Sequence, residues 1–249
     1  MTVKQYVMGK RCVVVVFIIC FFLNNLLSAQ ISRPRRVEMG VFAGPTVDWA
    51  IANTQNYKTK GIKVDGVYGL NIDFNLVQTS SNYYFSTGIN ARHIRYGLEY
   101  TDNYYFNGIK QEDTALINST FNTVYVTIPT AIKLKTTEFN RFVFWGLMGM
   151  EHGIAVSSKS NDEVKNIESG NIEEFKKVSQ YKNTAILKES VYFVIGAEYI
   201  IKDNTKATFG IAYDHGLNNM FRKKYKNKIS DEPVKAHTHR IEFQFGIIF

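Results

Sequence analysis

The charged residues that could do chemistry in this chain are spread singly along it and form no local motif. Several fall at every second position of alternating segments, which places them on one face of an extended strand. Enclosed carboxylates and cations could relay protons or ions, or they could form a static core of ion pairs. We expect the static core, because buried charges are tolerable only when they are paired. The residues of this expected polar network are Asp73, Arg92, Lys133, Glu198, Asp214, Arg240 and Glu242.

The histidines offer a second kind of chemistry, since imidazole is a common metal ligand. His237 and His239 lie two residues apart and would share one face of a strand. No acidic or histidine spacing completes a site around them, so we predict a polar rim, with no metal and no cofactor. The other histidines expected at this rim are His93, His152 and His215.

Nucleophilic catalysis has little support in the chain. Cys12 and Cys20 are the only cysteines, and both fall in the segment that we expect to be removed. No G-x-S-x-G motif occurs, and a hydrolase needs a nucleophile, a base and an orienting group in one site. We therefore predict a protein that is not an enzyme and has no evident small-molecule substrate. An enzyme is the least favoured of the three functions that we consider for this chain.

The N-terminal segment is typical of a secretory signal peptide. Lys4, Lys10 and Arg11 precede an apolar run at 12–23, and Ser28-Ala29 ends the pattern. We predict a signal peptide at 1–29 and a mature domain at 30–249; an uncleaved N-terminal anchor is the alternative. Removal of three cations and no acidic residue lowers the formal net charge from +8 to +5. The remaining basic excess is dispersed, so we expect no nucleic-acid partner.

The mature segment alternates between apolar and polar residues. It contains no apolar run of about 18 residues, so a membrane form must be a closed barrel of strands. Residues 66–77 give the clearest alternation, and 240–249 are similar. One face of these two segments carries Tyr68, Leu70, Ile72, Phe74, Leu76, Ile241, Phe243, Phe245, Ile247 and Phe249. The terminal Phe249 resembles the C-terminal assembly signal of bacterial outer-membrane barrels.

Six further segments complete a set of eight strands, at 37–48, 83–96, 123–135, 141–156, 190–201 and 206–217. Segment 141–156 is apolar on both faces, so its orientation stays open. Pro129 removes a ladder donor, and we expect a bulge or kink there.

The connections alternate between short and long, as in barrels with short periplasmic turns and long extracellular loops. The short connections are 78–82, 136–140 and 202–205, and the long ones are 49–65, 97–122, 157–189 and 218–236. A short helix is expected around 172–177, and Tyr104-Tyr105-Phe106 could contact a partner.

We therefore predict an all-β, eight-stranded antiparallel up-and-down barrel that spans the outer membrane of a Gram-negative bacterium and contacts its lipid. A soluble lipocalin-like barrel, with its apolar face inside, is the alternative. The lumen of eight strands is filled by side chains, so no protein cargo could pass through it.

Three segments carry a resemblance to a known family. Tyr125-Val126-Thr127-Ile128-Pro129, the stretch from Tyr213 to Asn219, and Val41-Phe42-Ala43-Gly44-Pro45 resemble motifs of the PorT-like outer-membrane β-barrel family. The resemblance implies a non-catalytic component of the type IX secretion system that acts beside the conduit with other secretion-system proteins. A structural or adhesive surface barrel, which binds an external partner through its long loops, is the alternative function.

Overall fold

The computed structural model describes residues 35–104, 113–202 and 204–249, and all its regular elements there are β-strands. The predicted signal peptide lies outside the described residues, as do Tyr105 and Phe106. Residues Arg35–Phe249 form one compact unit. Within the described ranges there is no helix with the length and hydropathy needed to cross a bilayer. The strands are β1 (Val37–Ala52), β2 (Tyr57–Thr59), β3 (Lys63–Asn75), β4 (Tyr83–Tyr104), β5 (Asp113–Lys135), β6 (Phe142–Asn166), β7 (Ile172–Ser179), β8 (Leu187–Lys202), β9 (Thr205–Gly216) and β10 (Ala236–Ile248).

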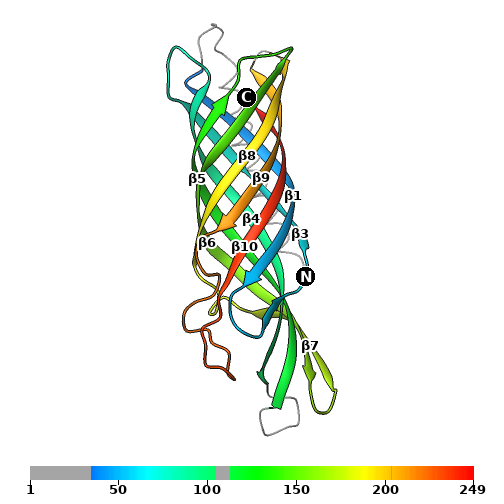
Figure 1. Cartoon of the computed structure of the whole chain (residues 1–249). Helices are drawn as coiled ribbons and strands as arrows, with labels where there is room; N and C mark the ends of the chain where they lie inside the picture. The colour runs from blue at the N-terminus through cyan, green and yellow to red at the C-terminus, as the bar shows by residue number, and fades with distance from the viewer. Residues whose placement is uncertain (1–34, 105–112, 203) are drawn as a thin grey trace, which may run out of the picture. The chain divides into compact units, whose positions relative to one another are not determined.

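Eight of these strands close into a barrel. Hydrogen-bonded neighbours follow the order β4-β3-β1-β10-β9-β8-β6-β5, and β5 pairs again with β4 (Figure 1). Every pairing is antiparallel, and the ring closes where β1 meets β10, for example at Val41 opposite Ile247. The predicted eight-stranded antiparallel barrel is confirmed. The short connections gather at one end, the turn end, and the long ones at the other, the loop end.

The apolar faces of the strands point outward. Leu70, Ile195 and Phe245 are 52%, 70% and 55% exposed, whereas Asp73 and Glu198 are buried in the lumen. This arrangement contradicts the lipocalin-like alternative, which requires an apolar interior.

The orientation of 141–156, which the sequence left open, is now assigned. Trp145 and Glu151 are buried in the lumen, while Phe144, Met148 and Ile154 are exposed outside.

The strands near the loop end are longer than the sequence indicated. Residues 97–122 were expected to be a loop, but β4 and β5 continue through most of this segment as a paired hairpin. The helix expected around 172–177 is wrong: β7 occupies it and pairs with β6, with Glu163 opposite Glu174. Ladder hydrogen bonds to a neighbouring strand here outweigh the local helical preference of Glu and Lys. The extended parts of β4, β5 and β6, with β2 and β7 at the edges, form one projecting sheet.

Pro129 does not produce the expected bulge. The β4–β5 ladder skips the pairs around Pro129 and resumes in the same register, from Thr87 opposite Thr130 to Asn90 opposite Thr127. The register shift of β5 against β6 lies instead between Val124 and Tyr125. Loss of one donor is therefore absorbed by a local gap in the ladder, without an extra residue.

Candidate functional site

The lumen at the turn end holds a cluster of six charges, which we call the turn-end cluster. It consists of Glu38, Asp73, Lys133, Lys135, Glu198 and Lys206. The Lys133 Nζ donates to Asp73 Oδ2 at 2.7 Å and lies 3.1 Å from Glu198 Oε1. The Lys135 Nζ lies 2.8 Å from the same Glu198 oxygen and 2.5 Å from Glu38 Oε2. Three carboxylates and three ammonium groups balance formally, so the cluster is a neutral network.

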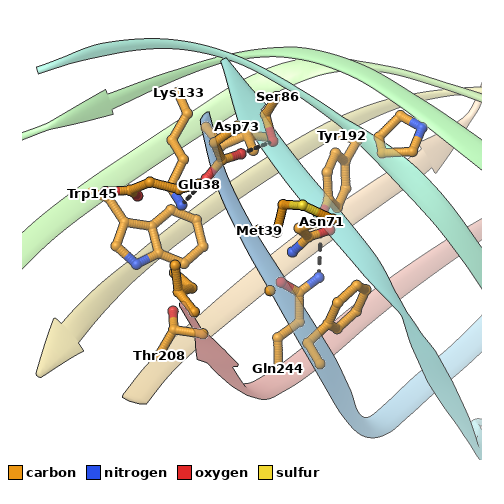
Figure 2. A pocket seen from close by; sticks show the side chains of 15 residues that line it. Glu38, Met39, Asn71, Asp73, Ser86, Lys133, Trp145, Tyr192, Thr208 and Gln244 are labelled. Carbon is orange, nitrogen blue, oxygen red and sulfur yellow. Dashed lines mark hydrogen bonds and ion pairs between the residues drawn. The ribbon is translucent and has the colours of Figure 1, made fainter. Parts of the chain in front are cut away.

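Aromatic side chains line this cluster. Lys133 Nζ lies 4.5 Å from the centroid of the Trp145 ring, and Lys135 Nζ lies 4.7 Å from that of Tyr84. Figure 2 shows Lys133, Asp73 and Ser86 directed toward one another, and Ser86 Oγ donates to Asp73 Oδ1 at 2.6 Å. The cavity between these side chains has a volume of about 20 Å³. That is room for about one water molecule, so the cavity cannot hold an organic substrate.

A second cluster fills the middle of the lumen, and we call it the mid-lumen cluster. It consists of Asp48, Arg92, Glu151, Lys188, Asp214, Arg240 and Glu242. Arg92 forms ion pairs with both Glu151 and Glu242, and all three side chains are fully buried. Arg240 Nε donates to Asp48 Oδ1 at 2.6 Å. Each cation in this cluster therefore links carboxylates from different strands across the lumen.

All seven residues of the predicted polar network lie in the lumen, but the structure divides them. Asp73, Lys133 and Glu198 belong to the turn-end cluster. The mid-lumen cluster holds Arg92, Asp214, Arg240 and Glu242. Sequence reasoning therefore found the correct face and not the two separate groups.

Six further members were missed: Glu38, Lys135, Lys206, Asp48, Glu151 and Lys188. Lys135 lies two residues after Lys133 on the same strand, so alternation alone could have placed its side chain in the lumen. Glu151 lies in the segment whose orientation was open, and Lys188 lies in a segment expected to be a loop. For these two residues the pairing of strands was needed.

The loop end is closed by an apolar core, which we call the loop-end core. It has aromatic centres: the Tyr96 and Phe121 rings stack with centroids 5.0 Å apart, and Phe221 packs 5.3 Å from Phe121. The buried members are Ala50, Tyr57, Ile94, Tyr96, Leu98, Tyr100, Ala115, Ile117, Phe121, Tyr125, Ala155, Val164, Met220, Phe221, Val234 and Ala236. This core lies between the mid-lumen cluster and the loop end along the same strands, so the inside of the barrel changes from charged to apolar.

The connection between β9 and β10 supplies the lid of this core. Its Met220, Phe221 and Val234 are buried, and Asn227 Nδ2 donates to the Thr101 carbonyl at 2.8 Å. The Lys228 amide donates to Asp102 Oδ1, also at 2.8 Å. Burial raises the pKa of Asp102 above its ordinary value, although this amide bond works against the rise. The segment is thus bound to β4 by hydrogen bonds as well as by packing.

The histidines lie on the outer side near the loop end. The ring of His239 lies 4.7 Å from that of His215, its partner across the β9–β10 ladder, and stacks on Trp49 at 5.6 Å. His237 Nδ1 instead lies 3.3 Å from the Gly216 carbonyl. No group of three or more metal-ligating residues occurs in the part of the chain that the structure describes. This set is an aromatic and polar belt.

The last residue lies at the seam of the barrel. The Phe249 amide donates to the Met39 carbonyl at 2.9 Å, so the C-terminus continues the pairing of β10 with β1. Its predicted role as an assembly signal stays a prediction.

One known protein family matches most of the chain. Its model, described as "Outer membrane protein beta-barrel domain", matches residues 28–222. This match is to outer-membrane barrels in general and carries nothing specific to the PorT-like family or to type IX secretion. No curated protein matches the chain.

Solved structures of outer-membrane proteins resemble the chain at low identity. Ail of Yersinia pestis, in complex with the heparin analogue sucrose octasulfate, is 13% identical, with a TM-score of 0.36 over 86% of this chain and 100% of that one. OprG from Pseudomonas aeruginosa is 8% identical, with a TM-score of 0.42 over 88% and 99%. The protease OmpT of Escherichia coli is 10% identical, with a TM-score of 0.36 over 88% and 98%. These scores are low, so the fold assignment rests on the strand ladders and on the family match.

Proposed function

We propose that this chain, which belongs to the family of outer membrane protein beta-barrel domains, is a non-enzymatic, non-conducting component of the type IX secretion system. It acts there as an accessory or scaffold beside the conduit. The observation that carries the non-conducting part is the filled interior. From the turn end to the loop end, the lumen is occupied by the turn-end cluster, the mid-lumen cluster and the loop-end core. The cavity at the turn end has room for about one water molecule.

The secretion role is supported by the sequence motifs. The Tyr125–Pro129 motif lies on β5 and the Tyr213 motif begins on β9, on either side of the barrel wall formed by β6 and β8. These segments therefore belong to the barrel wall itself. A barrel that cannot pass cargo serves secretion by binding other envelope proteins.

The loop end is the surface that suits such binding. Outer-membrane barrels direct their long loops outward, and the projecting sheet ends in β7, whose second edge has no strand partner within the described ranges. An unpaired edge can accept an extended segment of another protein. Figure 1 shows β7 at the margin of this sheet.

A deletion strain tests the proposal. We expect loss of secreted protease activity in the culture medium, with restoration by the wild-type gene supplied in trans. Normal secretion in the deletion strain would contradict the secretion role. It would not affect the conclusion that the chain folds as a barrel.

A surface adhesin is the second candidate, favoured by the same projecting sheet. It predicts a deletion strain with normal secretion and reduced attachment to a surface or host cell. An enzyme would instead lose a measurable activity on substitution of one serine or histidine, while the barrel still folds.

A further inference from the structure

A recess on the outer wall carries cations that neither the lumen clusters nor the loop-end core uses. It lies on the projecting sheet, between β4, β5, β6 and β7, with a volume of about 360 Å³. Lys159, Lys177 and His93 line it, together with hydroxyl and amide side chains such as Thr120 and Asn122. Its described lining includes no carboxylate. The recess therefore offers positive charge and hydrogen-bond donors to an anion.

A β-bulge aims the first lysine into the recess. Val124 pairs with Ser157 and Tyr125 pairs with Ala155, so Val156 is an extra residue in β6. Before this residue, even-numbered side chains of β6 point outward; after it, odd-numbered ones do. Lys159 would point inward without the extra residue. Bulges are a common device for re-aiming a side chain.

A second irregularity places the other lysine. Ser160 pairs with Val178 and Asp162 with Phe175, so β7 carries one extra residue at this point. Lys177 adopts a positive φ of 59°, and its amide donates to Asn161 Oδ1 at 2.8 Å. Positive φ is uncommon for a residue with a side chain, and such local strain concentrates at functional sites. Two separate departures from regular pairing thus bring two lysines to one recess.

The two ammonium groups are available to a ligand, because neither Lys159 nor Lys177 has an ion-pair partner within the described ranges. Two carboxylates of the same wall are already engaged elsewhere. Asp65 lies 3.4 Å from Arg95, and Glu163 accepts a hydrogen bond from Asn118 at 3.2 Å. Within the described ranges, the carboxylates of this wall therefore form no ion pair with either lysine of the recess.

The recess lies at the height where the apolar outer band ends. Directly toward the turn end, Val126, Ile154 and Val156 are 40%, 56% and 54% exposed. Tyr68, whose ring lies 6.0 Å from that of His93, marks the same level as an interfacial aromatic residue. Residues just beyond the lipid-facing band meet the headgroups of the outer leaflet.

From this geometry we propose that the recess binds a phosphate group carried by a lipid headgroup of the outer leaflet. Lys159 and Lys177 provide the charge, and the neighbouring hydroxyl and amide groups provide further hydrogen bonds. Lysine is a well-established phosphate ligand. The proposal does not depend on the secretion role.

Binding of lipid A, a doubly phosphorylated glycolipid, to the folded barrel in zwitterionic nanodiscs tests it. The wild-type barrel should bind lipid A at least about tenfold more tightly than dephosphorylated lipid A. The double variant Lys159→Gln/Lys177→Asn should lose this preference, since each basic residue near a membrane surface contributes severalfold to the binding of anionic lipid. Asparagine at 177 tolerates positive φ, and heat modifiability on a gel verifies that the variant is folded.

The matched control is Lys165→Gln/Lys182→Gln, which removes two exposed lysines that do not line the recess. This control should keep the wild-type preference. Equal binding by the wild type and the recess variant would overturn the proposal. If inorganic phosphate binds the recess as tightly as lipid A does, the site is one for a free anion, and the assignment to a lipid is wrong.

Discussion

The lumen of the barrel and its loop end fill the same set of inward positions with opposite chemistry. On β4 the successive inward residues change from the polar Asn90 and Arg92 to the apolar Ile94 and the aromatic Tyr96. The outward residues change in the opposite sense, from Ile89 to Arg95. Where lipid surrounds the wall, burial of apolar side chains inside gains nothing, and paired charges fill the space. Where water surrounds it, the hydrophobic effect again drives apolar side chains inward.

The comparison also assigns different kinds of stability to the two regions. In the lumen, each charge depends on a partner from another strand, so loss of one partner leaves a buried charge. In the loop-end core, each side chain contributes through packing, so loss of one leaves a cavity. Removal of single residues therefore separates the two regions experimentally.

The largest effect is expected for Arg92→Leu. This change removes one of the two cations that pair with each of Glu151 and Glu242. It leaves the mid-lumen cluster with four carboxylates and two cations, which should cost about 3–5 kcal/mol in the free energy of unfolding. Urea unfolding of the barrel in lipid vesicles measures it. Arg95→Leu is the control, because its contact with Asp65 is partly exposed and is worth at most about 1 kcal/mol. Equal effects of the two changes would contradict a dependence on buried pairing.

A smaller and more local effect is expected for Phe221→Ala. This ring is 2% exposed and packs against Tyr96 and Phe121, so its removal should cost about 3 kcal/mol. We expect the loss to appear as faster proteolysis within 217–235, with heat modifiability of the barrel unchanged. Collapse of the whole barrel in this variant would show that the loop-end core is not a separate region.

A pair of lysine substitutions on β5 tests the outward faces. Ile128 is 49% exposed on the apolar band, and Ile128→Lys should destabilise the barrel by about 2 kcal/mol in lipid. Asn118→Lys, on the same strand near the loop end, should have almost no effect because water surrounds it. Equal losses of stability at both positions would contradict a change from lipid to water along β5.

The smallest effect concerns pH. Burial raises the pKa of Asp102 in the folded protein, so the folded state binds this proton more readily than the unfolded state does. Stability of the loop end should therefore increase as pH falls through the raised pKa and decrease as pH rises through it. Proteolysis of 217–235 at several pH values measures this, and Asp102→Asn should flatten the dependence. If proteolysis of the Asp102→Asn variant depends on pH as in the wild type, another titratable group causes the dependence.

The sequence predicted much of the barrel, because alternation at period two is set by the backbone. It placed Asp73 and Glu198 inside and Leu70 and Phe245 outside, and the structure confirms both. It did not predict the strands beyond the apolar band. There the outward residues become polar, as in a loop, and only the pairing of β4 with β5 and of β6 with β7 shows that these segments are strands.

The polar network shows the same division. Parity identifies which residues point inward, but it cannot say which distant charges meet. Arg92, Glu151 and Glu242 lie on three strands, and their contact depends on how the barrel closes. The two bulges that aim Lys159 and Lys177 outward are likewise invisible to a strict alternation.

By itself the sequence determined the type of structure: strand-length segments that alternate between an apolar face and a polar face, with charges on the polar face. Each of these properties is local, because it depends on the order of residues along one strand. Only the tertiary structure decided which charges pair, how the loop-end core closes the mouth, and where the outer recess lies. Those features depend on register and closure between strands, which are long-range properties of the folded chain.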